Sequence, residues 1–226
     1  MDAVEQMTRL DSKDEERRTD QNRSIFLISL NIYSIIAKYE DLKEDKLLSK
    51  AQVLCLQESW LKPNRPADYD LEGFSAKHFN TVRHGAGLAT YFNDPFSFVR
   101  DITAVSYQIT VVCSSEICVI NLYRSKDASH TTLINSLRSA IQEQTHLTTY
   151  ICGDFNFCHH EERNHPIYRF LSEENFIPCG EPQASHREGR CIDMIWMQSS
   201  NVAGFNYSLK PVYYSDHGQQ ILKLNS

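Results

Sequence analysis

Residues 148–156 read TTYICGDFN, the strongest single motif in the chain. The apolar run has the length and composition of a buried β-strand, and the polar residues after it form a turn. Side chains two residues apart on an extended segment point the same way, so Asp154 and Asn156 are expected on one side. The ordinary alternative for this pair is an Asx turn that caps the next segment.

Five other short motifs also lie where an apolar, strand-like run ends. They are SLNI around Asn31, LQES around Glu58, NLYR around Tyr123, CIDMIW around Asp193, and SDH at Asp216 and His217. Each motif is weak alone, but together they predict one polar site built from strand ends, with carboxylates, amides and one histidine. Such a site suits hydrolysis of a phosphate ester with a hard divalent cation such as Mg²⁺.

Strand-like runs outnumber helical ones, and helices fall between consecutive buried strands. Strands are expected at 24–32, 52–58, 87–92, 96–100, 102–114, 116–123, 148–154, 190–197, 203–209 and 218–224. The middle runs follow one another at the short spacing of an antiparallel sheet. The pattern therefore predicts an α/β fold with two packed, mainly antiparallel sheets and helices on the outside.

Three helices are expected from apolar residues at helical spacing. Their inward faces are Ile35, Ile36, Tyr39, Leu42 and Leu47 in the first, Leu133, Ile134, Leu137, Ala140 and Ile141 in the second, and Ile167, Phe170 and Leu171 in the third, at about 165–174. The stretch 60–75 holds two prolines and a glycine and is expected to be mostly loop.

The N-terminal segment differs in composition from the rest of the chain. Residues 1–23 are charged and nearly free of apolar periodicity, which predicts a flexible N-terminal tail. Residues 24–226 are expected to form one domain, because no linker or repeat divides them. No apolar run approaches the ~18 residues that span a bilayer, and the N-terminus lacks a signal-peptide core. A soluble, intracellular protein without membrane contact is expected.

Cysteine content and charge limit the function classes further. The seven cysteines include no CxxC pair, and most lie in apolar runs, which predicts free, buried thiols rather than a disulfide framework. The net charge of −6 disfavours broad nucleic-acid binding. Carboxylates that bind a cation contribute to this total, so a local contact with DNA remains compatible with it.

The six motifs in this order resemble the endonuclease/exonuclease/phosphatase (DNase I-like) superfamily. Within it, the chain is most similar to the apurinic-like endonuclease domains of LINE-type retrotransposons and related mobile elements. The resemblance covers roughly residues 24–226. It rests on SLNI, LQESW, GLATYF, CVINLYR, ICGDFN, QASHREGRCIDMIW and PVYYSDH. It implies a four-layer α/β sandwich, Mg²⁺ as cofactor with Mn²⁺ as a substitute, and DNA as substrate.

Two departures from the family pattern are visible. Repair-type apurinic endonucleases usually carry Asp or Asn two residues after the first Asn, but here Asn31 is followed by Ile32 and Tyr33. This argues against dedicated abasic-site repair. The family also often has Pro shortly after the Tyr, whereas Tyr123 is followed by Arg124. The loop after the Tyr is therefore expected to differ.

The resemblance assigns metal binding and chemistry to the strand-end residues. Glu58 would be the principal metal ligand, with Asp216 at the metal directly or through water and Asn31 supporting the metal-bound water or Asp154. Asp154 would be the general base or orient the attacking water, and Asn156 would hold the scissile phosphate. For Glu58 the plain alternative is a strand-end acid that faces solvent.

Four further roles follow from the resemblance. Tyr123 would donate its hydroxyl to the phosphate, although a half-buried aromatic is the common alternative. Asp193 would pair with His217 and favour the protonated ring, which would stabilise the charge that develops in in-line attack. Ser185 would position the His/Asp region, and Ser215 would orient its loop. The alternative is a surface histidine that never meets Asp193.

Two clusters of polar residues each allow two interpretations. His186, Arg187 and Arg190 could touch DNA phosphates or form a solvated turn, and neither interpretation is favoured. Cys158, His159, His160 and His165 suggest zinc, but their irregular spacing favours a solvated polar loop.

The expected function is a Mg²⁺-dependent DNA endonuclease of the mobile-element type. It would nick a phosphodiester and leave 3′-hydroxyl and 5′-phosphate ends. The alternatives are a phosphodiesterase of the same superfamily that acts on RNA, a protein–DNA adduct or a phosphorylated lipid or sugar, and an inactive binding domain. A monomer is favoured, in the nucleus if chromosomal DNA is the substrate and otherwise in the cytoplasm.

Overall fold

The computed structural model describes residues 26–62, 67–79, 85–159, 161–181, 183–199 and 204–224. The expected N-terminal tail, residues 1–23, lies outside the described residues, as does His160 of the histidine-rich loop. No helix in the described part of the chain is long and apolar enough to cross a membrane. All seven cysteines are free and buried, which confirms the expectation of free thiols.

The described strands form two six-stranded sheets. The first has the order β11-β12-β1-β2-β4-β3 and the second the order β5-β6-β7-β8-β10-β9. The strands of the first sheet are β1 Phe26–Asn31, β2 Val53–Gln57, β3 Ser75–His78, β4 Leu88–Phe92, β11 Phe205–Lys210 and β12 Gln219–Leu224. Those of the second are β5 Ser97–Thr103, β6 Tyr107–Cys113, β7 Ile117–Arg124, β8 Thr148–Asp154, β9 Phe176–Pro178 and β10 Asp193–Gln198.

Each sheet contains one parallel pair, β1–β2 and β7–β8, and its other pairs are antiparallel. Parallel neighbours need a crossover connection. Helix α2 (Ile35–Glu44) supplies it for the first pair and α3 (His130–Gln142) for the second, while α4 (Pro166–Glu173) follows β8. The short 3₁₀ helices are η1 (Leu48–Lys50) and η2 (Ala67–Tyr69).

Helix starts follow local capping chemistry. The hydroxyl of Ser34 accepts from the N–H of Ala37 at the start of α2, and Ser129 plays the same part for Thr132 in α3. Helix α4 begins with proline, which costs no hydrogen bond at the first position.

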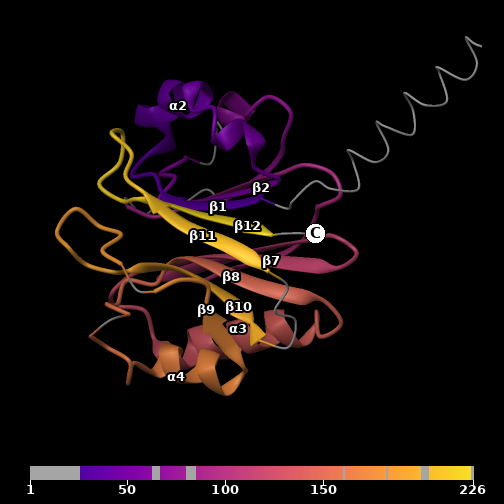
Figure 1. Ribbon diagram of the computed structural model, residues 1–226, viewed down its shortest axis with the longest axis vertical. Coiled ribbons are helices and arrows are strands. Elements are labelled where there is room, and N and C mark those ends of the chain that lie inside the picture. Colours follow the sequence, from indigo (N-terminus) through magenta and orange to yellow (C-terminus); the bar gives the residue numbers. More distant parts are fainter. Residues whose placement is uncertain are drawn as a thin grey trace, which may run out of the picture.

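Helices cover the outer faces of the two packed sheets, so the fold has four layers (Figure 1). One apolar cluster joins α2 to the first sheet, a second lies between the sheets, and a third joins the second sheet to α3 and α4. This confirms the predicted α/β sandwich. The inward face of α2 is narrower than expected, because Ile35 and Leu42 are buried whereas Ile36 is 47% exposed.

The topology gathers the predicted site at one end of the sandwich. Strands β1 and β2 are parallel and end together, and so do β7 and β8. Their antiparallel neighbours β12 and β10 begin at the same ends. The loops that precede β10 (orange) and β12 (yellow) lie on the same side of the molecule in Figure 1. The backbone N–H of Gly218 donates to the carbonyl of Ser185 between these loops.

Candidate active site

The side-chain amide of Asn31 connects the two sheets at this end. Its Nδ2 donates to Asp154 Oδ2 at 2.9 Å, at the end of β8, and to Glu58 Oε1 at 3.1 Å, just after β2. Asn31 and Asp154 are both buried. The amide therefore brings the two acids, which belong to different sheets, into one cluster.

Asp154 is a buried carboxylate among other acids. Burial and the neighbouring carboxylate of Asp193 raise the pKa of Asp154 well above its usual range, although the charge of His217 opposes the shift. The backbone N–H of Asn156 donates to Asp154 Oδ1 at 2.8 Å. An acid in this setting can take up a proton near neutral pH.

Asn156 lies beside Asp154 in the GDFN turn, and its contact with a phosphate stays a prediction. Its backbone contact with Asp154 is the Asx turn, and its Nδ2 also lies 3.3 Å from Asp154 Oδ2, as the spacing predicted. The same Nδ2 donates to the carbonyl of Arg124 at 2.7 Å. Asn156 has a φ of 54°, a left-handed conformation that Asn tolerates better than most residues.

His217 and Asp193 form the expected pair. His217 Nδ1 lies 2.7 Å from Asp193 Oδ2, and both side chains are buried. Burial alone would lower the pKa of His217, but the carboxylate of Asp193 outweighs it and the pKa rises to about 9. The ring is therefore cationic at neutral pH, with its Nε2 directed away from Asp193.

Two serines hold this pair in place. Ser185 Oγ donates to Asp193 Oδ2 at 2.6 Å and accepts from the backbone N–H groups of Ile192 and Asp193. Ser215 Oγ donates to the carbonyl of Asn31 at 2.7 Å and accepts from the N–H of His217 at 3.1 Å. Both serines therefore contact the residues or backbone next to the Asp193–His217 pair.

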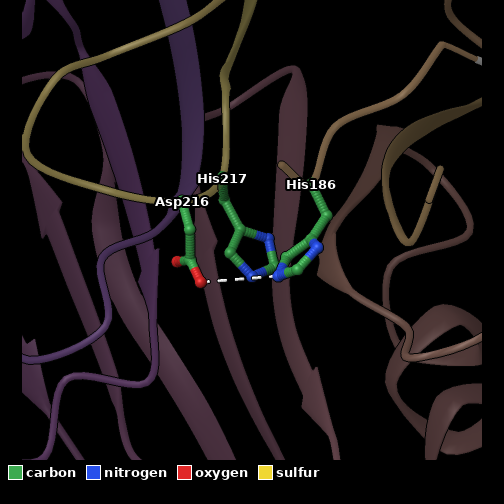
Figure 2. A group of neighbouring side chains, drawn as sticks. All are labelled: His186, Asp216 and His217. Carbon is green, nitrogen blue, oxygen red and sulfur yellow. Dashed lines mark ion pairs between the residues drawn. The ribbon is translucent and has the colours of Figure 1, made fainter. Parts of the chain in front are cut away.

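His186 stands beside Asp216, a contact that the motifs did not predict. Figure 2 shows the rings of His186 and His217 next to the Asp216 carboxylate, whose Oδ2 lies 3.4 Å from His186 Nε2. The N–H of Glu188 donates to His186 Nδ1 at 3.1 Å, so a neutral ring carries its proton on Nε2, toward Asp216. Asp216 therefore holds the His186 ring at the site.

Glu58 sits in a strained turn after β2. Its φ is 53°, a conformation that costs a residue other than glycine about 1–3 kcal/mol. Burial raises the pKa of Glu58, while the Asn31 amide and the charge of His217 pull it down and Asp216 raises it. The charge of Asp216 therefore reaches Glu58, which places both carboxylates at the same site.

A cleft of about 480 Å³ opens over this cluster. The predicted residues that line it are Glu58, Tyr123, Asp154, Asn156, His186, Arg190, Asp216 and His217. The Tyr123 hydroxyl also donates to the carbonyl of Gly85 at 2.6 Å. Arg187 lines a neighbouring hollow of about 340 Å³ instead.

The sequence motifs assign no role to the buried cation Arg124. Its Nη1 donates to the carbonyl of Phe155 at 2.9 Å, beneath the GDFN turn. Burial lowers the pKa of Arg124, and the charge of Asp154 partly restores it. Its position directly after Tyr123 is the one signal that could have pointed to it.

The donor set fits a divalent cation. Asp193 Oδ1 and Asp216 Oδ1 are buried and have no hydrogen-bond partner among the described residues. Within the described chain, two groups of three bring ligand atoms within 4.8 Å: His186, Asp216 and His217, and Asp154, Asp193 and His217. Glu58 belongs to neither group. Of the predicted ligands, Glu58 and Asp216 line the cleft, and the buried Asn31 contacts Glu58.

The profile of the Endonuclease/Exonuclease/phosphatase family matches residues 28–217. The chain belongs to this family. Its members are metal-dependent nucleases and phosphatases, so the chain is a hydrolase of the DNase I-like class. The match spans all six strand-end motifs, from Asn31 to His217.

Solved structures of this family have the same fold. The endonuclease domain of TRAS1, a telomere-specific non-LTR retrotransposon, is 12% identical with a TM-score of 0.67, covering 89% of this chain and 98% of that one. The 3′-5′ exonuclease NExo from Neisseria meningitidis is 16% identical with a TM-score of 0.68, covering 89% and 100%. An AP endonuclease from Archaeoglobus fulgidus is 15% identical with a TM-score of 0.67, also covering 89% and 100%. The comparison with curated protein sequences finds no match.

Proposed function

We propose that this hydrolase is a Mg²⁺-dependent DNA endonuclease of the mobile-element type, which nicks one strand and leaves 3′-hydroxyl and 5′-phosphate ends. The observation that carries the proposal is the Asn31 amide, which joins Glu58 and Asp154 beside the Asp193–His217 pair. These residues supply an acid for proton transfer, a cation for developing charge and oxygen ligands for a metal. Phosphodiester hydrolysis needs all three.

In this mechanism Asp154 accepts a proton from the attacking water, and Asn31 and the Asn156 backbone fix the direction of its two oxygens. The imidazolium of His217, held by Asp193, stabilises the charge that develops on the phosphate. By the motif resemblance, Asn156 and Tyr123 would donate to the phosphate oxygens in place of their present contacts with the carbonyls of Arg124 and Gly85. Proton transfer and charge stabilisation are thus assigned to groups whose environments move their pKa values in the required directions.

Glu58, Asn31 and Asp216 would hold the cation, with Mn²⁺ as a substitute for Mg²⁺. A bound cation would neutralise the phosphate and lower the pKa of a coordinated water. The excess of carboxylates at the cleft supports this assignment, because clustered acids repel one another unless a positive charge lies between them.

The DNA substrate and the mobile-element type rest on the motif resemblance. The structural likeness to the TRAS1 endonuclease domain is consistent with this branch. Tyr33, at the position where repair-type enzymes usually carry Asp or Asn, argues against abasic-site repair.

The test is nicking of supercoiled plasmid by the wild type with Mg²⁺, by the wild type with EDTA, and by His217→Ala protein with Mg²⁺. We expect nicked circles only in the first reaction. Folded wild-type protein that leaves the plasmid supercoiled under all ionic conditions would refute the DNA endonuclease proposal.

A second candidate is another phosphoesterase activity at the same site. A Neisseria 3′ phosphatase bound to a product DNA hairpin has the same fold, with a TM-score of 0.66 and 16% identity. DNA hairpins with a 3′-phosphate, RNA and protein–DNA adducts are the substrates that discriminate it. Their turnover without plasmid nicking would favour this candidate.

A further inference from the structure

Tyr33 lines the cleft but has no part in the chemistry described above. We propose that Tyr33, supported by Trp60, is a stacking platform for an unpaired nucleobase next to the scissile phosphate. This inference rests on the proposed function and narrows its substrate class. The substrate would be DNA in which a base beside the cleavage point is unstacked, as in a single strand, a bulge or a frayed end.

The position of Tyr33 is tied to the catalytic cluster. Its backbone N–H donates to Asn31 Oδ1 at 3.1 Å, while the Nδ2 of the same amide donates to Asp154. Its side chain is 50% exposed and lines the cleft together with Glu58 and His217. About half of the Tyr33 surface is therefore available to a ligand in the cleft.

Trp60 supports the ring from behind. The two ring centroids are 4.5 Å apart with an interplanar angle of 57°, within the range of favourable aromatic pairs. Trp60 is less exposed than Tyr33, which leaves Tyr33 as the outer member of the pair. The pair therefore restricts the motion of Tyr33 before any ligand arrives, which reduces the entropy lost on binding.

The backbone under this pair is held in unusual conformations. Tyr33 and Trp60 have φ values of 50° and 55°, in a region that bulky residues rarely adopt. The N–H groups of Ser34 and Ile35 donate to the carbonyls of Glu58 and Ser59 at 2.8 and 3.0 Å, which joins the two turns. Such conformations cluster at ligand-binding and catalytic sites, where surrounding contacts maintain them.

The chemistry of the exposed group selects a nucleobase. An aromatic side chain offers a π-face to any base, and stacking of this kind is tolerant of sequence. It requires a base that has left its own stack, because a paired base inside a duplex offers no free face. The platform therefore predicts a preference for locally unpaired DNA without a preference for one base.

The experiment uses a DNA oligonucleotide with an unpaired 2-aminopurine, whose fluorescence falls when it stacks on an aromatic ring. All proteins carry Asp154→Asn, which prevents turnover, and binding is measured with Mg²⁺. Three are compared: one with the native Tyr33, one with Tyr33→Ala and one with Tyr33→Phe. We expect quenching with Tyr33 and Tyr33→Phe, and about tenfold weaker binding without quenching for Tyr33→Ala. Phe98→Ala, which removes an exposed aromatic outside the cleft lining, is the matched control.

Cleavage kinetics separate this inference from the proposed function. In the otherwise wild-type enzyme, Tyr33→Ala should raise KM for bulged DNA about tenfold and leave kcat nearly unchanged. Equal quenching and equal KM with Ala at position 33, in an enzyme that still nicks DNA, would overturn the platform and leave the nuclease proposal intact. Equal losses in Tyr33→Phe and Tyr33→Ala would also overturn it, because the hydroxyl rather than the ring would then matter. Wild-type protein that neither binds nor cleaves DNA would instead refute the nuclease proposal itself.

Discussion

Asn31 Nδ2 lies 2.9 Å from Asp154 Oδ2, so one side-chain amide links the end of β1 in the first sheet to the end of β8 in the second. The residues are 123 positions apart in the chain. Because both are buried, the hydrogen bond is protected from water and fixes the direction of the carboxylate. Asn31 thus connects the packing of the sheets with the geometry of the site.

Replacing Asn31 should damage catalysis more than stability. Asn31→Ala removes the donor to Asp154 and Glu58, and we expect single-turnover nicking to slow by about 100-fold, the typical effect of a lost positioning group. Asn31→Asp should slow nicking further, because it places a third carboxylate in contact with those of Glu58 and Asp154. Asn93→Ala removes an amide that donates to Ala51 away from the cleft and should nick at the wild-type rate. Wild-type nicking by Asn31→Ala would contradict the assignment.

Asp193 and His217 should behave as one unit. Asp193→Asn keeps the shape but removes the charge that holds the imidazolium, and a loss of about 10²–10⁴ in kcat is expected, as for other carboxylate–imidazole pairs. The double variant Asp193→Asn/His217→Ala should be little worse than His217→Ala alone. Multiplicative losses in kcat would mean that the two side chains act independently.

Glu58 should control the cation requirement. Glu58→Gln keeps the hydrogen-bonding shape but removes one negative charge, so the Mg²⁺ concentration for half-maximal nicking should rise about tenfold or more. Titrating Mg²⁺ in the nicking assay measures this shift. Glu116→Gln changes an exposed acid in the β6–β7 turn and serves as the control. An unchanged Mg²⁺ titration for Glu58→Gln would contradict Glu58 as a ligand and would assign the cation to Asp216 and His186 instead.

Much of this site could be predicted from the sequence, because strand ends are marked by local patterns. The buried strands that lead to Asn31, Glu58 and Asp154 are short apolar runs. Parallel pairing brings the ends of β1 and β2 together, and the packing of the two sheets adds the end of β8. The order of the motifs then pointed to the family. The Asp193–His217 pair was inferred from resemblance, and its 2.7 Å separation is a property of the fold that no spacing rule supplies.

Other features depend on contacts that leave no local pattern. Strand β3 was missed because it is a short edge strand whose SAKH lacks buried apolar residues. The contact of His186 with Asp216 depends on two loops that meet only in the folded chain. Arg124 was overlooked because a buried arginine is uncommon and its partners are mostly backbone carbonyls, with the His130 ring in addition.

His159 should make the protein sensitive to acid. Its ring is fully buried among Phe155, Phe157 and Trp196, neither ring nitrogen has a partner among the described residues, and burial lowers its pKa to about 3. The unfolded chain takes up this proton near pH 6.5, so the stability contribution is complete above that pH and is lost between about 6.5 and 3.

Replacement by an apolar ring isolates this effect. His159→Phe should be at least as stable as the wild type at neutral pH. When the pH falls to about 4.5, the free energy of unfolding should drop by about 3 kcal/mol less in the variant than in the wild type. Urea denaturation at several pH values measures the difference. His146→Phe, at an exposed histidine, should keep the acid dependence of the wild type. The same dependence in His159→Phe would refute the assignment.

Gly153 should tolerate no side chain. A Cβ at position 153 would lie 1.8 Å from the carbonyl oxygen of Leu122. The φ of Gly153 is 141°, which L side chains rarely adopt. Gly153→Ala must therefore push β7 and β8 apart just before Asp154, and we expect a loss of at least about 3 kcal/mol in unfolding free energy. Gly73→Ala also adds a Cβ at positive φ, but into open space, and should cost only about 1 kcal/mol. If thermal or urea unfolding shows equal losses of unfolding free energy for the two variants, the positive φ rather than the contact with Leu122 sets the cost.

The most direct test of the central claim is the chemistry of the nick. Supercoiled plasmid is treated with wild-type or Asp154→Asn protein and Mg²⁺, and the product is then incubated with DNA ligase, which seals only a 3′-hydroxyl next to a 5′-phosphate. We expect nicked circles that ligase closes with the wild type, and no nicks with the variant. The absence of nicking by the folded wild type, or nicks that ligase cannot close, would contradict it.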